Sequence, residues 1–463
     1  MSFFIRTDRS VKRNEQILKQ SHKRKRKHGT SSEKDLGKVG DDDEEIESED
    51  DEFERPRKSN DFQDDESDDP GETVQEKRLR LAKVYLEEIQ RREAALLENG
   101  EVNKDTVTNL LKDDLLEKSH RLRKVVADKY TGFHEEGIKV LRCKDHHLTL
   151  TCLVISSDNK FIYTGSKDSA IVKWSIDEAR KVKSIRGNKK DKTLIGAVLC
   201  LAISSDNKFL VSGGTNKVVQ VWNPNTLELV HSFSGHKDSV TGVAFRKNTH
   251  TLFSCSLDRT VKLWNLVEMS YVETLFGHQT GITAVDALMG ERALTSGGRD
   301  NSVRLWKIIE ESQLIYNGHK GSIDCVKLIN EDHFISGGDD GFLCVWGTMK
   351  KKPLCSVPNA HGVCSTNEEP NWISSVAALL NTDLVASSSN DGSVKLWKCE
   401  RNYIKLVHLF SIPVVGFVNS MAFTSDGTQL ILAVGKEHRL GRWSKIDAAK
   451  NTVVIIPLVK SGD

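Results

Sequence analysis

The sequence has no run of apolar residues long enough to cross a membrane, since no stretch approaches about 18 consecutive apolar residues. Its first residues also lack the apolar core of a secretory signal. The nine cysteines are scattered from Cys143 to Cys399 without a C-x-x-C pair. This pattern indicates reduced thiols rather than a disulfide scaffold or a zinc site. We therefore expect a cytosolic or nuclear protein without membrane contact.

Catalytic signatures are missing as well. The sequence contains no H-E-x-x-H motif, no nucleophile elbow and no Walker motif. The Ser-Gly-Gly triplets at 212–214, 296–298 and 336–338 could be mistaken for phosphate-binding loops, but none of them opens a helix. The sequence therefore predicts a protein that is not an enzyme and that holds no cofactor and no metal.

Charge is distributed unevenly along the 463 residues, although the total is only +1. Residues 1–38 carry a net +8, residues 39–70 carry −14, residues 71–133 carry +1 and the remaining residues carry +6. A near-neutral total thus conceals a basic arm, an acidic arm and a mildly basic body.

Residues 1–71 are predicted to be a disordered arm, basic and then acidic, because they have few apolar residues to bury. The arm contains five consecutive cations, which are Lys23, Arg24, Lys25, Arg26 and Lys27. Such a run indicates a nuclear or nucleolar targeting signal or a nucleic-acid contact, with a solvated charge run as the alternative.

Residues 72–131 are predicted to form two amphipathic helices. The segment 72–98 is rich in good helix formers, and the second helix is expected from about Lys104 to Ala127. Their apolar faces could pack on each other, on the rest of the chain or on a partner, and the sequence does not choose between these.

Tryptophan recurs with a nearly constant period from residue 137 onward. Seven of them are separated by 48, 42, 42, 40, 51 and 46 residues: Trp174, Trp222, Trp264, Trp306, Trp346, Trp397 and Trp443. A period of 40–50 residues with short β-rich runs is typical of a β-propeller. We therefore predict an all-β fold, a seven-bladed propeller over residues 137–460.

Histidine, a hydroxyl residue, aspartate and tryptophan recur together at fixed positions of the repeat. A catalytic triad occurs once in a protein, whereas this set is repeated, so we interpret it as a buried hydrogen-bond chain that stabilises each blade. The five sets are His146, Thr164, Asp168 and Trp174; His236, Ser254, Asp258 and Trp264; His278, Ser296, Asp300 and Trp306; His319, Ser336, Asp340 and Trp346; His361, Ser387, Asp391 and Trp397.

Basic residues in the loops are the candidates for binding RNA. Lys167, Arg299 and Lys436 each precede the turn acid of a repeat, and a strongly basic connection contains Arg186, Lys189, Lys190 and Lys192. Such side chains would contact RNA through phosphate charge and shape, with a solvated loop as the alternative.

Closure of the ring has two candidate strands. Ile138–Leu141 and Val453–Leu458 both look like an outer strand of the last blade, so one of them takes that place or both join the blade.

The repeat resembles the WD-repeat family, although no tryptophan here is followed by aspartate. More specifically, the chain resembles the WD-repeat proteins of the U3 small nucleolar ribonucleoprotein. The residues that carry this resemblance are Val74–Leu86, Ser270–His278, Gly297–Asp300, Gly321–Cys325, Trp372–Leu384 and Glu437–Trp443.

This resemblance implies a nucleolar, non-catalytic RNA-binding component of the small-subunit processome that acts in pre-ribosomal RNA processing. It implies binding to the box B/C region of U3 small nucleolar RNA, beside the small kink-turn-binding protein, fibrillarin and other box C/D particle proteins. The alternative is a nuclear WD-repeat adaptor for protein or chromatin partners that does not bind RNA directly.

Overall fold

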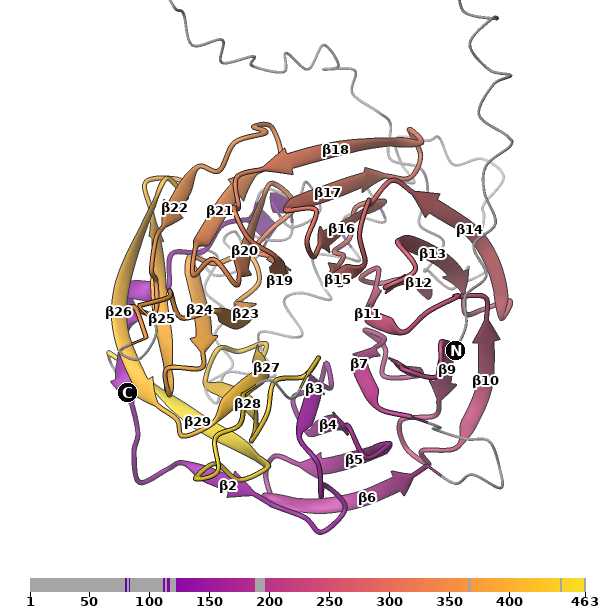
Figure 1. Cartoon of the computed structure of the whole chain (residues 1–463), viewed down its shortest axis with the longest axis horizontal. Coiled ribbons are helices and arrows are strands. Elements are labelled where there is room, and N and C mark those ends of the chain that lie inside the picture. Colours follow the sequence, from indigo (N-terminus) through magenta and orange to yellow (C-terminus); the bar gives the residue numbers. More distant parts are fainter. Residues whose placement is uncertain are drawn as a thin grey trace, which may run out of the picture. The chain divides into compact units, whose positions relative to one another are not determined.

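The computed structural model describes residues 122–187, 196–364, 368–441 and 444–461, together with a few helical residues before them. These residues form seven antiparallel sheets, here called blades 1 to 7, which are arranged in a ring (Figure 1). The first strands of the blades line a central channel. The fold confirms the predicted seven-bladed propeller. The predicted arm with Lys23–Lys27 lies outside the described residues, as does most of the segment predicted to be helical.

Blades 1 to 6 each consist of four consecutive strands. Blade 1 contains β3 (Leu150–Ile155), β4 (Phe161–Ser166), β5 (Ala170–Ser175) and β6 (Arg180–Arg186). Blade 2 contains β7 (Val198–Ile203), β8 (Leu210–Gly214), β9 (Val218–Trp222) and β10 (Leu229–Ser234). Blade 3 contains β11 (Val240–Phe245), β12 (Thr251–Ser256), β13 (Thr260–Asn265) and β14 (Ser270–Phe276).

The next three blades repeat the same order. Blade 4 contains β15 (Ile282–Asp286), β16 (Arg292–Gly297), β17 (Ser302–Lys307) and β18 (Ser312–Asn317). Blade 5 contains β19 (Ile323–Leu328), β20 (His333–Gly338), β21 (Leu343–Gly347) and β22 (Cys355–Val357). Blade 6 contains β23 (Ile373–Ala378), β24 (Leu384–Ser389), β25 (Ser393–Glu400) and β26 (Lys405–Pro413).

Blade 7 combines the two ends of the described chain. It contains β27 (Phe417–Phe423), β28 (Gln429–Gly435) and β29 (Thr452–Lys460), and β29 also pairs with β1 (Tyr130–Phe133) and β2 (Lys139–Leu141). Both candidate closing segments therefore join the blade, β2 as an outer strand and β29 as the third strand. The propeller begins at Tyr130, before the predicted start at residue 137.

The tryptophan register does not extend to blade 7, which corrects the sequence interpretation. In blades 1 to 6 the tryptophan lies on the third strand, as Trp264 does on β13. The third strand of blade 7 is β29, which follows a long connection from β28 and contains no tryptophan. Trp443 lies in this connection and is outside the described residues.

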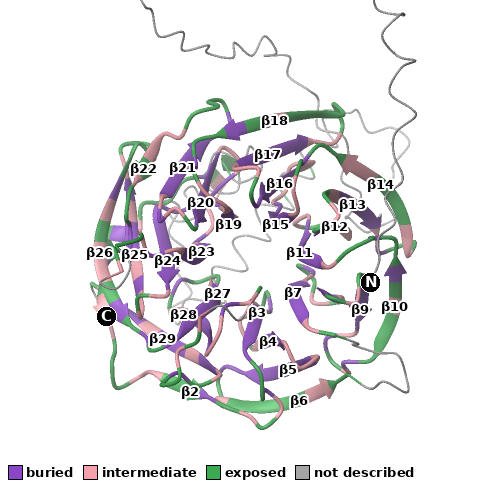
Figure 2. Ribbon diagram, in the orientation of Figure 1, coloured by how far each residue is buried: buried purple, intermediate pink, exposed green. Residues whose placement is uncertain are grey.

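The core lies between neighbouring blades rather than within any one of them. The third strand β5 is buried along its whole length, whereas the outer strands β6 and β10 are largely exposed (Figure 2). The ring of Trp264 in blade 3, for example, stacks on Phe233 of blade 2 with 4.8 Å between ring centroids. Each blade thus depends on both neighbours for its buried surface, and closure of the ring completes the core.

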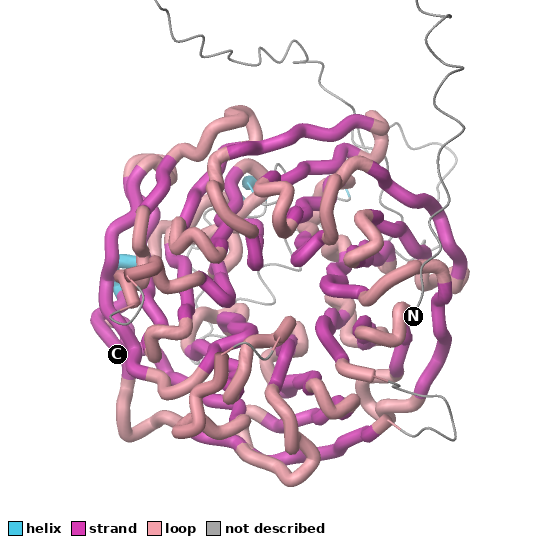
Figure 3. Tube along the Cα trace, viewed as in Figure 1, coloured by secondary structure: helices cyan, strands magenta, loops and turns pink. Residues whose placement is uncertain are grey.

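The segment before β1 is anchored to blade 6. The backbone N–H groups of Val126 and Ala127 donate to the Asp383 carboxylate over 2.7 and 3.0 Å, and Lys124 forms a bridge with Thr382. This bonding starts a single turn of 3-10 helix, η1 (Ala127–Lys129), which is one of the few helical turns in the described chain (Figure 3).

The predicted second helix ends earlier than expected. Leu111, Lys112, Leu115 and Leu116 are helical, but residues 122–126 are not. The backbone N–H groups of Lys124 and Val126 donate to Asn381 and Asp383 of blade 6, and these hydrogen bonds replace the ones that a helix would form. Among the described residues, no helix has the length and apolar character that spanning a membrane requires.

Arg439 reaches from blade 7 across the central channel. Its guanidinium donates to the backbone carbonyls of Asp324 on β19 and Thr283 on β15, over 2.5 and 3.4 Å. The Asp324 side chain is buried beside it, and burial raises its carboxyl pKa to about 6 despite the opposing effect of Arg439.

Candidate nucleic-acid interface

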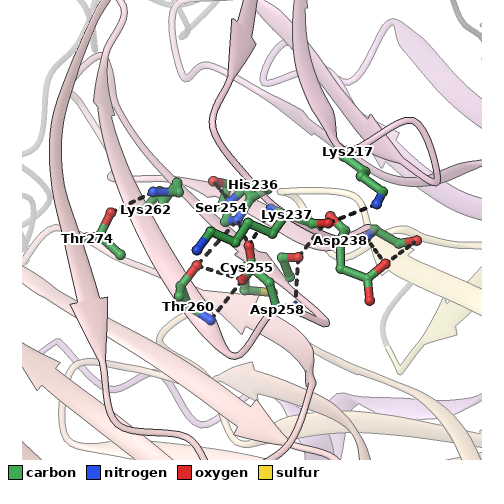
Figure 4. A network of polar contacts seen from close by, with 12 residues as sticks. Lys217, His236, Lys237, Asp238, Ser254, Cys255, Asp258, Thr260, Lys262 and Thr274 are labelled. Carbon is green, nitrogen blue, oxygen red and sulfur yellow. Dashed lines mark hydrogen bonds and ion pairs between the residues drawn. The ribbon is translucent and has the colours of Figure 1, made fainter.

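A chain of buried hydrogen bonds fixes the loops at one end of blade 3 (Figure 4). The indole N–H of Trp264 donates to the Ser254 hydroxyl over 2.8 Å, and this oxygen lies 2.8 Å from Nε2 of His236. The other ring nitrogen of His236 lies 3.0 Å from the Asp258 carboxylate. Burial lowers the pKa of His236, so the neutral ring donates from Nδ1 to Asp258 and accepts from Ser254 at Nε2.

The same chain joins the turn to the connection between blades. Asp258 lies in the turn between β12 and β13, and it also accepts the backbone N–H of Lys237 over 2.8 Å. Blades 5 and 6 repeat the arrangement through His319 and His361. We call this end of the ring, where these histidine-containing connections meet the turns between second and third strands, the histidine face.

Blade 4 uses a different hydroxyl from the one predicted. His278 Nε2 and the indole N–H of Trp306 both lie 2.8 Å from the hydroxyl of Thr295, not of Ser296. The reason is one additional residue in the turn, because Thr295 pairs with Arg304 whereas Ser254 of blade 3 pairs with Lys262. Ser296 instead lies 2.8 Å from the hydroxyl of Thr283 on the neighbouring strand.

Blades 1 and 2 have incomplete chains. His146 Nε2 lies 2.9 Å from Thr164, which also accepts from Trp174, but His146 Nδ1 has no hydrogen-bond partner and Asp168 accepts backbone N–H groups instead. In blade 2, Trp222 donates to Ser212 over 2.8 Å, and the sequence has no histidine in the connection before β7.

Breaking this chain in blade 4 should destabilise the propeller. We expect His278→Ala and Asp300→Ala each to lower the free energy of unfolding by about 1–3 kcal/mol, because each leaves a buried polar group unpaired. Thermal and denaturant unfolding would measure the change, with the exposed neighbour substitution Gln279→Ala as the control. Unchanged stability in both variants would contradict a structural role for the chain.

Exposed cations gather in the loops of the histidine face. Five of them follow one another over blades 2 to 5: Lys217, Lys237, Arg259, Arg299 and Lys320. We call this set the basic arc. The turn and connection that carry it are held in place by the hydrogen-bond chain, since Lys237 and Lys320 each donate their backbone N–H to a turn aspartate. An ordered row of cations is suited to binding a phosphate backbone.

The RNA-binding candidates predicted from the sequence are distributed differently. Arg299 is exposed and belongs to the basic arc, and Lys436 is half-buried in the connection after β28. Arg186 is 48% exposed and pairs with Asp145 over 3.1 Å. Lys189, Lys190 and Lys192 lie outside the described residues.

Lys167 has a structural environment that the sequence did not predict. Its side chain is only 11% exposed, and its amine donates to the backbone carbonyls of His438 and Gly441 over 2.6 and 3.1 Å. It also pairs with Glu437 over 3.5 Å. Lys167 thus joins blade 1 to blade 7 instead of presenting a charge to solvent.

Four members of the basic arc were missed by the sequence reasoning, which considered the residue before each turn acid and the basic connection after blade 1. Lys217 and Arg259 directly follow the turn residues Asn216 and Asp258, and Lys237 and Lys320 directly follow the histidines. The position after the repeated polar residue was therefore the signal that could have found them.

The fold and the repeated polar chain define a WD-repeat β-propeller. Residues 137–175, 269–307, 310–347 and 362–398 match the family described as WD domain, G-beta repeat. Residues 202–280 match the first β-propeller of WD repeat-containing protein 75.

Within this class, the chain belongs to the family of U3 small nucleolar RNA-interacting protein 2. It is 50% identical to the Homo sapiens protein over 394 residues, which cover 84% of this chain and 82% of that protein. A solved structure described as the crystal structure of RRP9 WD40 repeats has a TM-score of 0.69 and 50% identity, covering 71% of this chain and 99% of that one. Ribosomal RNA-processing protein 9 of Saccharomyces cerevisiae is 29% identical over 174 residues, covering 31% of this chain and 30% of that protein. The family is a non-catalytic WD-repeat scaffold.

Proposed function

We propose that this chain binds U3 small nucleolar RNA as a non-catalytic scaffold of the U3 ribonucleoprotein in the nucleolus and acts there in pre-ribosomal RNA processing. The name of its human relative states an interaction with that RNA, and the name of the yeast relative states ribosomal RNA processing. The observation that carries the proposal is the basic arc, because five exposed cations on a rigid face provide the charge that RNA binding requires.

The finer parts of the proposal are the contact region and the partners. We propose that the RNA segment is the box B/C region and that the neighbours are the small kink-turn-binding protein, fibrillarin and other box C/D particle proteins within the small-subunit processome. Lys23–Lys27 would serve nucleolar targeting, and Arg186, Lys189, Lys190, Lys192 and Lys436 remain candidates for additional phosphate contacts.

Crosslinking followed by RNA sequencing tests the proposal in cells. We expect U3 RNA to be enriched over other nucleolar RNAs, because the arc would hold it directly. Enrichment of protein or chromatin partners without U3 RNA would instead favour the adaptor function and contradict direct RNA binding.

Charge removal tests the arc itself. Changing Arg259 and Arg299 to Ala should weaken the binding of a U3 RNA transcript and lower the slope of log affinity against log salt by about 1.4–1.8, since each lost phosphate contact removes roughly 0.7–0.9. The control is Lys208→Ala, an exposed cation in the turn between β7 and β8 at the opposite end of the strands. Equal slopes in both variants would place the interface elsewhere.

A further inference from the structure

An aromatic ring stands exposed at the outer end of blade 3, on the histidine face. Phe276 is the last residue of β14 and is 71% exposed, although every residue of the third strand beside it, β13, is buried or half-buried. A single exposed apolar side chain is common on protein surfaces, so the position of Phe276 among the charged loops of the histidine face is the informative feature.

Two cations of the basic arc lie at the same end of blade 3 as this ring. Phe276 pairs with Thr260 across the two strands, and Thr260 directly follows Arg259 in the chain. Lys237 is connected to the same end of the blade through Asp258. The Asp258 carboxylate accepts the backbone N–H of Lys237, and it also accepts the Thr260 hydroxyl over 2.6 Å. The ring and the two cations therefore stand on one hydrogen-bonded scaffold.

The corresponding corners of neighbouring blades have no aromatic ring. The last residues of the outer strands β6, β10 and β18 are Arg186, Ser234 and Asn317. The turn itself does not set blade 3 apart, because Lys217 of blade 2 and Asn301 of blade 4 have φ values of 64° and 54° at the position where Arg259 has 70°. The exposed ring at the end of the outer strand is what distinguishes this corner of blade 3 from those of blades 1, 2 and 4.

We propose that Phe276 is a stacking platform for one unpaired base of the bound RNA, with Arg259 and Lys237 on the phosphates that flank it. This inference rests on the proposed function, because it specifies which part of the RNA the basic arc receives. An exposed aromatic ring with two cations nearby is the arrangement that proteins use to bind single-stranded nucleic acids. In such sites the bases stack on aromatic rings and the cations contact the phosphates of the nucleic-acid backbone. The site would therefore favour a single-stranded segment of RNA over a continuous duplex.

The test compares the full chain with Phe276→Ala and Phe276→Trp in binding a U3 RNA transcript. We expect Phe276→Ala to lower the affinity roughly 5- to 150-fold, the range for loss of one stacked base, and Phe276→Trp to retain it. The salt dependence should not change in Phe276→Ala, since no phosphate contact is lost, whereas Arg259→Ala should lower its slope by about 1. A matched control is Val267→Ala in the same blade, because Val267 is also 71% exposed but lies in the turn after β13, at the other end of the strands.

Each alternative outcome separates this inference from the proposed function. If Phe276→Ala binds the transcript as tightly as the unchanged chain while Arg259→Ala shows the smaller salt slope, the stacking platform is wrong and RNA binding by the arc stands. If Phe276→Ala loses only a protein of the particle in co-purification, the ring is a protein contact and the inference is overturned. If the unchanged chain does not bind the transcript, the proposed function itself fails.

Discussion

Lowering the pH from 7 to 5 should reduce the free energy of unfolding of the propeller by about 5 kcal/mol, because several histidines are buried as neutral rings. Burial lowers the pKa of His146 and of His333 to about 4, and that of His438 to about 3, from the ordinary value of 6.5. The direction is the same for His236 and His278.

The sign of this dependence follows from proton binding. Between pH 6.5 and 4 the unfolded chain protonates these histidines while the folded chain does not, so stability is present above pH 6.5 and is lost as the pH falls. At pH 5 each of His146, His333 and His438 contributes a loss of about 2 kcal/mol. Asp324 opposes them by roughly 1 kcal/mol, because its pKa is raised to about 6 and protonation favours the folded state.

Denaturant unfolding at pH 7, 6 and 5 would measure the effect, and two variants identify its source. In His333→Phe the ring can still stack on Tyr403, with which His333 has a centroid distance of 4.2 Å, and the loss between pH 7 and 5 should shrink by about 2 kcal/mol. In Asp324→Asn the opposing carboxyl is gone, so the loss should grow by roughly 1 kcal/mol. A free energy that is flat from pH 7 to 5 would contradict the neutral burial of these rings.

The regular blades could be predicted from sequence because their pairing is local. In blade 3 the hydroxyl of Ser254 and the indole of Trp264 are ten residues apart on adjacent strands joined by a short turn, so a repeated spacing specifies their contact. The same rule failed in blade 4, where one additional turn residue moves the contact from Ser296 to Thr295. Spacing counts residues, whereas the contact depends on strand register.

The closure of the ring and the exposure of loop charges could not be predicted in this way. β29 takes the third position of blade 7, and its outer edge is covered by β1 and β2, which are more than 300 residues away in the chain. Lys167 is buried by the carbonyls of His438 and Gly441, which come from the far end of the chain. Such contacts depend on which segments meet when the ring closes, and a single repeat does not contain that information.

Replacing Tyr130 and Leu141, the buried side chains of the outer strands β1 and β2, with alanine should lower the free energy of unfolding by about 6 kcal/mol. Tyr130 on β1 is buried between blades 6 and 7, and Leu141 on β2 is buried between blades 7 and 1. The Tyr130 hydroxyl also donates to the backbone carbonyl of Gly427 over 2.7 Å. Replacing a buried aromatic or leucine side chain with alanine costs about 3 kcal/mol each. The two residues lie on separate strands and in separate core clusters, so the losses should add.

Denaturant unfolding of the Tyr130→Ala and Leu141→Ala double variant would measure this loss. Val140→Ala is the matched control, because Val140 is adjacent to Leu141 on β2 but is exposed, and its change should stay below about 0.5 kcal/mol. A loss below about 1 kcal/mol in the double variant would mean that β27, β28 and β29 close the ring without the outer strands. A loss of about 6 kcal/mol would show that β1 and β2 stabilise the closed ring, since both side chains belong to strands that pair with β29 at the other end of the described chain.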